Sequence, residues 1–253
     1  MKKDHHKQLI ELLKELHLPM FREYYEEFAQ KATADELGYE DYLYELAVRE
    51  CEVRRANKIA RLVKASKLPL EKTLATFDIK RLPLKLRRQV DVLLEGSFVQ
   101  RRENILAFGK PGSGKTHLLC AICHQLARQG KRVYFASCDL MVQELLRAKQ
   151  ELKLDKWLKK LSQYEALMID DFGYVKQNRE EMEVLFTLLA HRYERGSVLI
   201  TSNLPFSKWE QIFKDPMTTA AAIDRLVHHS VILELNVPSY RAEEAQKRKT
   251  EIA

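Results

Sequence analysis

The sequence predicts an α/β protein in which a parallel five-stranded sheet lies between helices and a small all-helical domain precedes it. From residue 104 onward, short apolar runs alternate with helical stretches of ten or more residues. Strands that are apolar along their length and are separated by helices are typical of a parallel sheet covered on both faces. The first 75 residues instead carry apolar side chains at helical spacing. A chain of 253 residues is long enough for one large domain and one small one.

The order of the elements follows from where these patterns change. Pro19 and Gly38 each separate a pair of helical segments, because proline and glycine commonly mark helix boundaries. We expect a helical N-terminal domain at residues 1–66, a linker at 67–83 and the α/β domain at 84–253. The five expected strands are Ile105–Phe108, Arg132–Ala136, Leu167–Ile169, Val198–Thr201 and Val231–Leu235.

Composition argues against a membrane protein or a secreted one. No window reaches the roughly 18 apolar residues of a membrane span, and the charged start lacks the apolar run of a signal peptide. We therefore expect a cytoplasmic protein with no membrane partner. Of the four cysteines, Cys120 and Cys123 form a C-x-x-C pair, but the second ligand pair of a zinc site is missing. Core packing is the expected role of this pair.

The net charge of +7 is distributed unevenly along the chain. Residues 1–48 contain 6 basic and 11 acidic side chains, whereas residues 49–102 contain 15 basic and 6 acidic ones. Residues 149–160 add 5 basic and 2 acidic side chains. Basic segments separated in this way suit a polyanionic partner, although solvated helix faces give the same pattern.

A phosphate-binding loop follows the first expected strand. The segment GKPGSGKT matches G-x-x-x-x-G-K-[ST] in full, between an apolar strand and an apolar helix. Its glycines allow backbone N–H groups to wrap a phosphate, its lysine can neutralise the β- and γ-phosphates, and its threonine hydroxyl can bind Mg²⁺. The residues expected to contact ATP are Gly109, Pro111, Gly112, Ser113, Gly114, Lys115, Thr116 and His117.

Two consecutive acids end the third expected strand. An apolar strand ending in an acid is the Walker B arrangement, so Asp170 is expected to hold Mg²⁺ together with Thr116. Asp171 lies where a general base would activate the attacking water, a position at which glutamate is commoner. Because aspartate is one methylene shorter, we expect slow turnover. A cap of the following turn is the alternative role of Asp171.

Three further polar residues suggest an AAA+ ATPase. About 54 residues separate Lys115 from Asp170, which leaves room for the extra strand of this class. Asn203 ends the fourth strand, where a sensor of the γ-phosphate lies in AAA+ proteins, and Arg225 precedes the last strand, where such proteins carry an arginine that reaches a neighbour's site. Only 18 residues follow Leu235, so we expect no full C-terminal lid, with Arg241 as a further contact to the γ-phosphate.

Together these motifs resemble the IstB family, the helper ATPases of bacterial insertion sequences, which is similar to the helicase loader DnaC. The segments that carry the resemblance are GKPGSGKTHL, IDDFG, TSNLPF, DRLVHH and SYR, within residues 70–245. The resemblance implies a homo-oligomer that assembles with ATP on double-stranded DNA and stimulates a transposase. A loader of a replicative helicase on single strands stays the alternative, since it shares nearly all these motifs. Hydrolysis that times assembly and release, and an ATP-dependent scaffold with little turnover, both remain open.

Two basic groups are candidates for DNA contacts. We expect the first on an N-terminal helix and the second on one face of a helix between the second and third strands, because its lysines recur every three or four residues. The first group is Arg54, Arg55, Lys58 and Arg61, and the second is Lys149, Lys153, Lys156 and Lys160.

Overall fold

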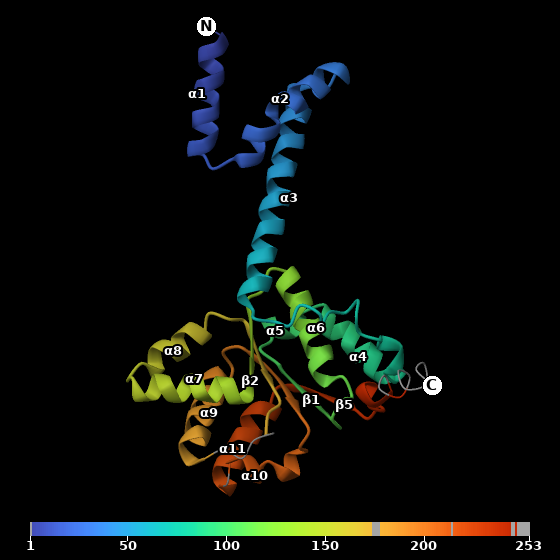
Figure 1. Cartoon of the computed structure of the whole chain (residues 1–253), viewed down its shortest axis with the longest axis vertical. Coiled ribbons are helices and arrows are strands. Elements are labelled where there is room, and N and C mark those ends of the chain that lie inside the picture. Colours follow the sequence, from blue (N-terminus) through green and yellow to red (C-terminus); the bar gives the residue numbers. More distant parts are fainter. Residues whose placement is uncertain (1, 174–177, 214, 244–245, 247–253) are drawn as a thin grey trace. The chain divides into compact units, whose positions relative to one another are not determined.

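The computed structural model describes residues 2–173, 178–213, 215–243 and 246 of the chain (Figure 1). They form two compact units, Met1–Arg61 and Leu62–Ala253. No helix in this described part of the chain is long and apolar enough to cross a membrane.

The first unit is helical, as the apolar spacing predicts. It contains α1 (Lys2–Glu15), α2 (Pro19–Ala34) and most of α3 (Tyr39–Ala65). Pro19 occupies the first turn of α2, where its missing N–H costs no hydrogen bond. The carbonyl of Gly38 accepts the amide of Tyr42 in the first turn of α3. Both predicted helix boundaries are therefore confirmed.

One buried carboxylate connects two helices of this unit. Glu50, on α3, is 3% exposed, and its carboxylate accepts the amide of Met20 at 2.9 Å and Nε of Arg54 at 2.6 Å. Arg54 also donates to the carbonyl of His17. Because a buried charge without partners is costly, this network holds the start of α2 against α3.

The second unit is built on a parallel five-stranded sheet in the order β2-β3-β4-β1-β5 (Figure 1). Its strands are β1 (Asn104–Gly109), β2 (Val133–Ser137), β3 (Ala166–Asp170), β4 (Ser197–Ser202) and β5 (Ser230–Leu235). All five coincide with the predicted strands within two residues. β3 and β4 are buried along their whole length, since they lie inside the sheet and are covered on both faces.

Helices cover both faces of this sheet, and each face has its own apolar core. The helices are α4 (Leu84–Leu94), α5 (Ser97–Gln100), α6 (Lys115–Arg128), α7 (Cys138–Gln150), α8 (Leu154–Leu161), α9 (Arg179–Arg192), α10 (Glu210–Phe213) and α11 (Pro216–Val227), with short 3₁₀ turns η1 (Ile79–Arg81) and η2 (Phe206–Lys208). One core combines side chains of α4, α5 and α6, and the other combines α7 to α11. Along β1, Leu106 faces the second core and its neighbours Ile105 and Ala107 face the first, as the alternation of strand side chains requires.

Residues 67–83 pack on the sheet through two buried leucines. Leu68 and Leu82 are at most 5% exposed and belong to the core beneath α6. Just before them, the carbonyl of Ser66 accepts the amide of Phe135 at 2.8 Å, beside the edge strand β2. The segment thus lies along the α/β unit, while the domain limits at residues 66 and 84 stay a prediction.

After β5, the described residues supply a short segment and no three-helix lid. The amide of Tyr240 donates to the carbonyl of Gly112 at 3.0 Å, and Arg81 pairs with Glu243 at 2.7 Å. This C-terminal segment, residues 238–243, therefore lies against the loop that follows β1. The predicted architecture, a parallel five-stranded sheet between helices that follows a helical N-terminal region, is confirmed for the described part of the chain.

A buried arginine joins three parts of this unit. Arg192, the last residue of α9, is 2% exposed, and burial lowers its pKa to about 10, which leaves it cationic at neutral pH. Its guanidinium donates to the carbonyls of Leu161, Tyr164, Glu165 and Ser197 at 2.8–3.3 Å. It therefore connects the end of α8, the loop before β3 and the start of β4.

We expect Arg192→Met to lower the free energy of unfolding by about 3 kcal/mol, because four carbonyls lose their buried donor. Urea unfolding followed by circular dichroism measures this change. Arg195→Met, at an exposed position three residues later, is the control and should change stability by less than about 0.5 kcal/mol. Equal stability of the two variants would show that the four hydrogen bonds contribute nothing.

Candidate nucleotide site

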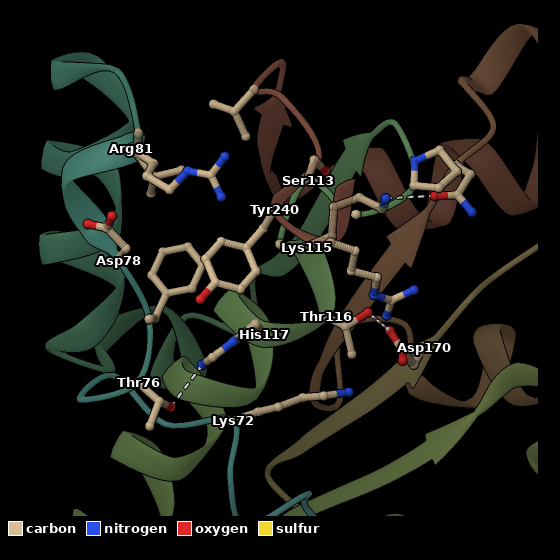
Figure 2. Close-up of a pocket in the computed structure, with 18 of the residues that line it drawn as sticks. Lys72, Thr76, Asp78, Arg81, Ser113, Lys115, Thr116, His117, Asp170 and Tyr240 are labelled. Carbon is tan, nitrogen blue, oxygen red and sulfur yellow. Dashed lines mark hydrogen bonds between the residues drawn. The ribbon is translucent and has the colours of Figure 1, made fainter. Parts of the chain in front are cut away.

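The candidate site lies at the carboxyl edge of the sheet, where the ends of β1, β3 and β4 meet. These three strands are adjacent and parallel, so the loop after β1, Asp170 at the end of β3 and Asn203 just after β4 all come to one edge. Ligands of open α/β sheets bind at this edge. A cavity of about 620 Å³ opens here (Figure 2).

The loop after β1 has the conformation of a phosphate cradle. Gly112 and Gly114 have φ values of +78° and +92°, in a region that side chains with a Cβ rarely adopt. A Cβ at Gly114 would also lie 3.1 Å from the ring of Phe77. α6 starts directly afterwards at Lys115 and is fixed by its largely buried apolar face, so its N-terminus points at the cavity.

Lys115 is the buried cation of the site. It is 5% exposed, and its Nζ donates to Asn203 Oδ1 at 2.6 Å and to the carbonyls of Gly109 and Lys110 at 2.9 and 3.0 Å. Burial lowers the pKa of Lys115, while the nearby carboxylates of Asp171 and Asp170 oppose that decrease. A bound phosphate would add further negative charge and stabilise the protonated amine.

Asp170 is held by two threonine hydroxyls. Its Oδ1 accepts Thr116 Oγ1 at 2.8 Å (Figure 2). It also accepts Thr201 Oγ1 at 2.5 Å, and the residue is 8% exposed. Thr116 lies in the first turn of α6 and Thr201 belongs to β4, so the carboxylate is positioned from two sides. The two residues predicted to bind a metal, Thr116 and Asp170, are thus in direct contact.

Asp171 turns out of the strand toward the cavity. Its φ is +56°, a left-handed conformation that aspartate tolerates better than most residues, and its amide donates to Thr201 Oγ1 at 2.9 Å. Desolvation raises the pKa of Asp171, and the charge of Asp170 adds to the increase. Lys115, Arg241 and Lys72 act in the opposite direction.

The remaining predicted residues lie at different distances from the cavity. Asn203 lines it and contacts Lys115, and Arg241 lines it close enough to influence the charges of both Lys115 and Asp171. Arg225 does not line it: its Nη1 donates to the carbonyl of Ala221 at 2.9 Å, and its guanidinium lies 5.0 Å from the ring centre of Phe186.

His117 connects the phosphate loop to the segment before α4. Its Nε2 lies 3.1 Å from Thr76 Oγ1 (Figure 2) and 3.0 Å from the carbonyl of Thr73. Its ring packs against that of Phe77 in a T-shaped arrangement. Burial lowers the pKa of His117, which favours the neutral ring. In the structure His117 therefore contacts the segment before α4, which forms one wall of the cavity.

Sequence reasoning missed several residues that line the cavity. Lys72, Thr76, Asp78, Arg81 and Tyr240 surround it, and Arg81 lies 5.1 Å from the ring centre of Tyr240 (Figure 2). Figure 2 shows the amine of Lys72 extending toward Thr116 and Asp170. Two features of the sequence point toward these residues: the position of the segment around Phe77 and the SYR motif. Neither of them indicates which side chains line the cavity.

ATP and Mg²⁺ fit these residues. Ser113 Oγ is buried in the phosphate loop and has no hydrogen-bond partner among the described residues, which leaves it available to a ligand. Lys115 supplies a cation for phosphate, and the hydroxyl of Thr116 beside the Asp170 carboxylate supplies the oxygen donors that Mg²⁺ prefers. The cavity is also large enough for a nucleotide.

The second basic group does not form one helix face, so that expectation is wrong. Lys149 lies on α7 and Lys153 precedes α8, because the chain turns at residues 151–152, where Leu152 has a φ of +57°. Lys149 pairs with Glu183 at 3.1 Å, and Lys153 pairs with Glu151 at 2.9 Å. The last two residues of the group, Lys156 and Lys160, share α8, where Lys160 lies over the ring of Trp157.

Known proteins similar to this chain are described as ATP-binding proteins, in agreement with a nucleotide site. The family model of IstB-like ATP-binding proteins matches residues 11–249. The chain belongs to the IstB-like ATP-binding protein family. It is 39% identical to an insertion-sequence ATP-binding protein of Sinorhizobium fredii over 94% of this chain and 80% of that one. It is also 39% identical to a protein named as the ATP-binding protein of insertion sequence IS5376 of Geobacillus stearothermophilus, over 90% and 91% of the two chains.

Solved structures of AAA+ proteins share the fold of this IstB-like protein. The DnaC helicase loader aligns with a TM-score of 0.56 at 17% identity, over 65% of this chain and 97% of that one. AMPPCP-bound DnaA from Aquifex aeolicus aligns with a TM-score of 0.56 at 19% identity, over 73% and 56%. The predicted family is confirmed, and the likeness to these structures confirms the predicted AAA+ fold.

Proposed function

We propose that this IstB-like protein is a transposition regulator that assembles with ATP and Mg²⁺ on double-stranded DNA and stimulates the transposase of an insertion sequence. The observation that carries the proposal is a cavity lined by a phosphate-binding loop and two aspartates, in a chain whose relatives are named for insertion sequences. The likeness to DnaC concerns the fold alone, so a helicase loader is the less favoured function.

Each residue of the site has a defined task in the proposed hydrolysis. Lys115 and the loop amides hold the β- and γ-phosphates, and Asn203 orients the γ-phosphate and the attacking water. Mg²⁺, held by Thr116 and Asp170, would neutralise charge on the phosphate oxygens. Asp171 accepts the proton of the attacking water. Because this side chain is short, turnover is slow in the absence of DNA.

Arg225 acts on the site of a neighbouring subunit in this proposal. It does not line the cavity of its own chain; its guanidinium donates to the carbonyl of Ala221 and lies over the ring of Phe186. An arginine supplied in this way stabilises charge on the transferred phosphoryl group. A homo-oligomer is therefore required for full activity.

We expect Arg225→Ala to lower the rate of ATP hydrolysis by roughly 10- to 100-fold without weakening nucleotide binding to the monomer, because the arginine contacts only the transition state. Arg225→Lys keeps the positive charge but loses the planar guanidinium, so its hydrolysis rate should lie between those of the parent and Arg225→Ala. Colorimetric phosphate release and titration of a fluorescent ATP analogue measure these quantities. Parent-like hydrolysis by Arg225→Ala would remove this residue from the site.

Mixing two inactive variants tests whether Arg225 acts between subunits. Arg225→Ala keeps Asp171, and Asp171→Asn keeps Arg225, so a mixed oligomer contains some interfaces with both functional residues. Recovery of hydrolysis on mixing supports action between subunits. If the mixture stays as inactive as its components while mixed oligomers form, Arg225 acts within its own chain or not at all.

DNA binding by the whole protein is the direct test of the function. Fluorescence anisotropy with a duplex of roughly 50 base pairs and a single strand of equal length, each with Mg²⁺-ATP and Mg²⁺-ADP at several salt concentrations, separates the candidates. Tighter, ATP-dependent binding to the duplex supports the transposition regulator. Preference for the single strand would favour the helicase loader, and binding to neither would overturn both.

A further inference from the structure

A basic groove lies within the first unit, separate from the nucleotide site. It is a hollow of about 640 Å³ whose walls come from α3 on one side and from the junction of α1 and α2 on the other. The lysines and arginines that line it are Lys14, Arg22, Arg54, Lys58 and Arg61.

Basic side chains gather at the groove, although residues 1–48, which form part of it, are acidic on average. Residues 1–48 carry 11 acidic and 6 basic side chains, yet those that reach the groove from this stretch include Lys14 and Arg22 and no acid. Among the described residues of the lining, Glu50 is the only acid, and its side chain is 4% exposed and paired with Arg54. The surface that the groove presents is therefore positive.

The cations of the groove differ in their availability. Arg54 is engaged, because it donates to Glu50 and to the carbonyl of His17 and so keeps the two walls together. Lys14, Arg22 and Lys58 are exposed and form no ion pair with other described residues, while Arg61 donates only to the carbonyl of Asn57. Four cations thus surround the groove without an acidic partner.

The dimensions of the groove suit a nucleic-acid backbone. Arg54, Lys58 and Arg61 follow one face of α3, and seven residues of helix rise about 10.5 Å, the axial length of about three nucleotides of one strand. The floor includes the apolar side chains of Leu13 and Leu18. An anionic backbone can approach the rim while its sugars face this floor.

We infer that this groove is a phosphodiester-binding site that holds one strand of DNA by its backbone, with Lys14 and Arg22 facing Lys58 and Arg61 across it. The inference rests on the proposed function and specifies where DNA is bound. Contacts to phosphate carry no sequence information, so the site supports weakly sequence-specific binding. Arg55, although predicted with the basic helix, does not line the groove.

Charge reversal in the full-length protein tests the site. We expect Lys58→Glu/Arg61→Glu to weaken binding to a fluorescent 50-base-pair duplex at least tenfold with Mg²⁺-ATP and to lower the salt dependence of log K by about two. Lys14→Gln/Arg22→Gln, on the opposite wall, should reduce affinity in the same way. The control for the charge reversal is Lys7→Glu/Lys64→Glu, which makes the same change in net charge as Lys58→Glu/Arg61→Glu at exposed positions outside the groove.

Several readouts distinguish the outcomes. Unfolding curves and binding of a fluorescent ATP analogue must match the parent, which excludes misfolding as the cause of lost DNA binding. If the control loses as much affinity as the groove variants, or if neither groove variant loses any, the groove is not the site, although the proposed function stands. If the parent binds no DNA, both fail. Displacement of the duplex by polyglutamate at equal charge concentration would indicate an acidic protein partner and overturn the assignment to nucleic acid.

Discussion

Lys115→Ala is expected to abolish ATP binding at micromolar nucleotide and to reduce hydrolysis and ATP-dependent DNA binding to background. The amine is the buried cation of the loop, and each charge-assisted hydrogen bond to phosphate contributes about 1.5–3 kcal/mol, so the loss of two such bonds lowers affinity by at least roughly 100-fold. Titration of a fluorescent ATP analogue measures this loss directly.

A thermal shift gives an independent measure for the same variant. A ligand present at 100 times its dissociation constant stabilises the folded protein by about 2.7 kcal/mol, so the parent should melt at a higher temperature with ATP, and Lys115→Ala should not. Lys110→Ala is the matched control, because Lys110 lies in the same loop, is exposed and does not line the cavity. ATP-dependent stabilisation of Lys115→Ala equal to that of the parent would contradict the assigned role.

Asp171→Asn is expected to bind ATP with parent affinity while its hydrolysis falls by roughly 10²- to 10⁴-fold, the usual contribution of a general base. Asparagine keeps the size of the side chain and tolerates the left-handed backbone at φ +56°, so the fold should be unchanged. In the proposed function this variant stays on DNA as an ATP-bound oligomer, which size-exclusion chromatography with labelled duplex detects. Hydrolysis at the parent rate would show that Asp171 only caps its turn.

The acidic limb of the pH–rate profile gives a second test of Asp171. Only the deprotonated carboxylate can accept a proton, and desolvation together with the Asp170 charge raises its pKa. The hydrolysis rate should therefore fall, as pH is lowered, at a higher pH than an ordinary aspartate would give. Thermal melts across the same pH range establish that the protein remains folded. The residual hydrolysis of Asp171→Asn can be followed over the same pH range. If its acidic limb falls at the same pH as that of the parent, the titrating group is not Asp171.

The sheet and the phosphate loop were predictable because their signals are local. Each strand is a continuous apolar run, and the loop from Gly109 to Thr116 contains its glycines, lysine and threonine within eight consecutive residues. The parallel order then fixes that Asp170 and Asn203 reach the same edge, so these assignments required only the strand pattern.

The other wall of the cavity could not be predicted, because it is built from distant segments. Arg81 precedes the sheet and Tyr240 follows it, and they meet only because both segments pack beside the phosphate loop. Neither residue stands in a spacing that indicates a ligand. In the same way, helical spacing predicted one face for Lys149 and Lys153, but the turn at Leu152 interrupts the helix between them.

The strand order also determines when the site can first exist during synthesis. β1 and its loop leave the ribosome before both strands that flank them in the sheet, β4 and β5. Tyr240, whose amide binds the carbonyl of Gly112, emerges later still. A nascent chain therefore displays an unpaired β1, open to wrong pairing, until β4 has been translated. Because Tyr240 and Arg241 line the cavity, the nucleotide site is complete only after nearly the whole chain has been translated.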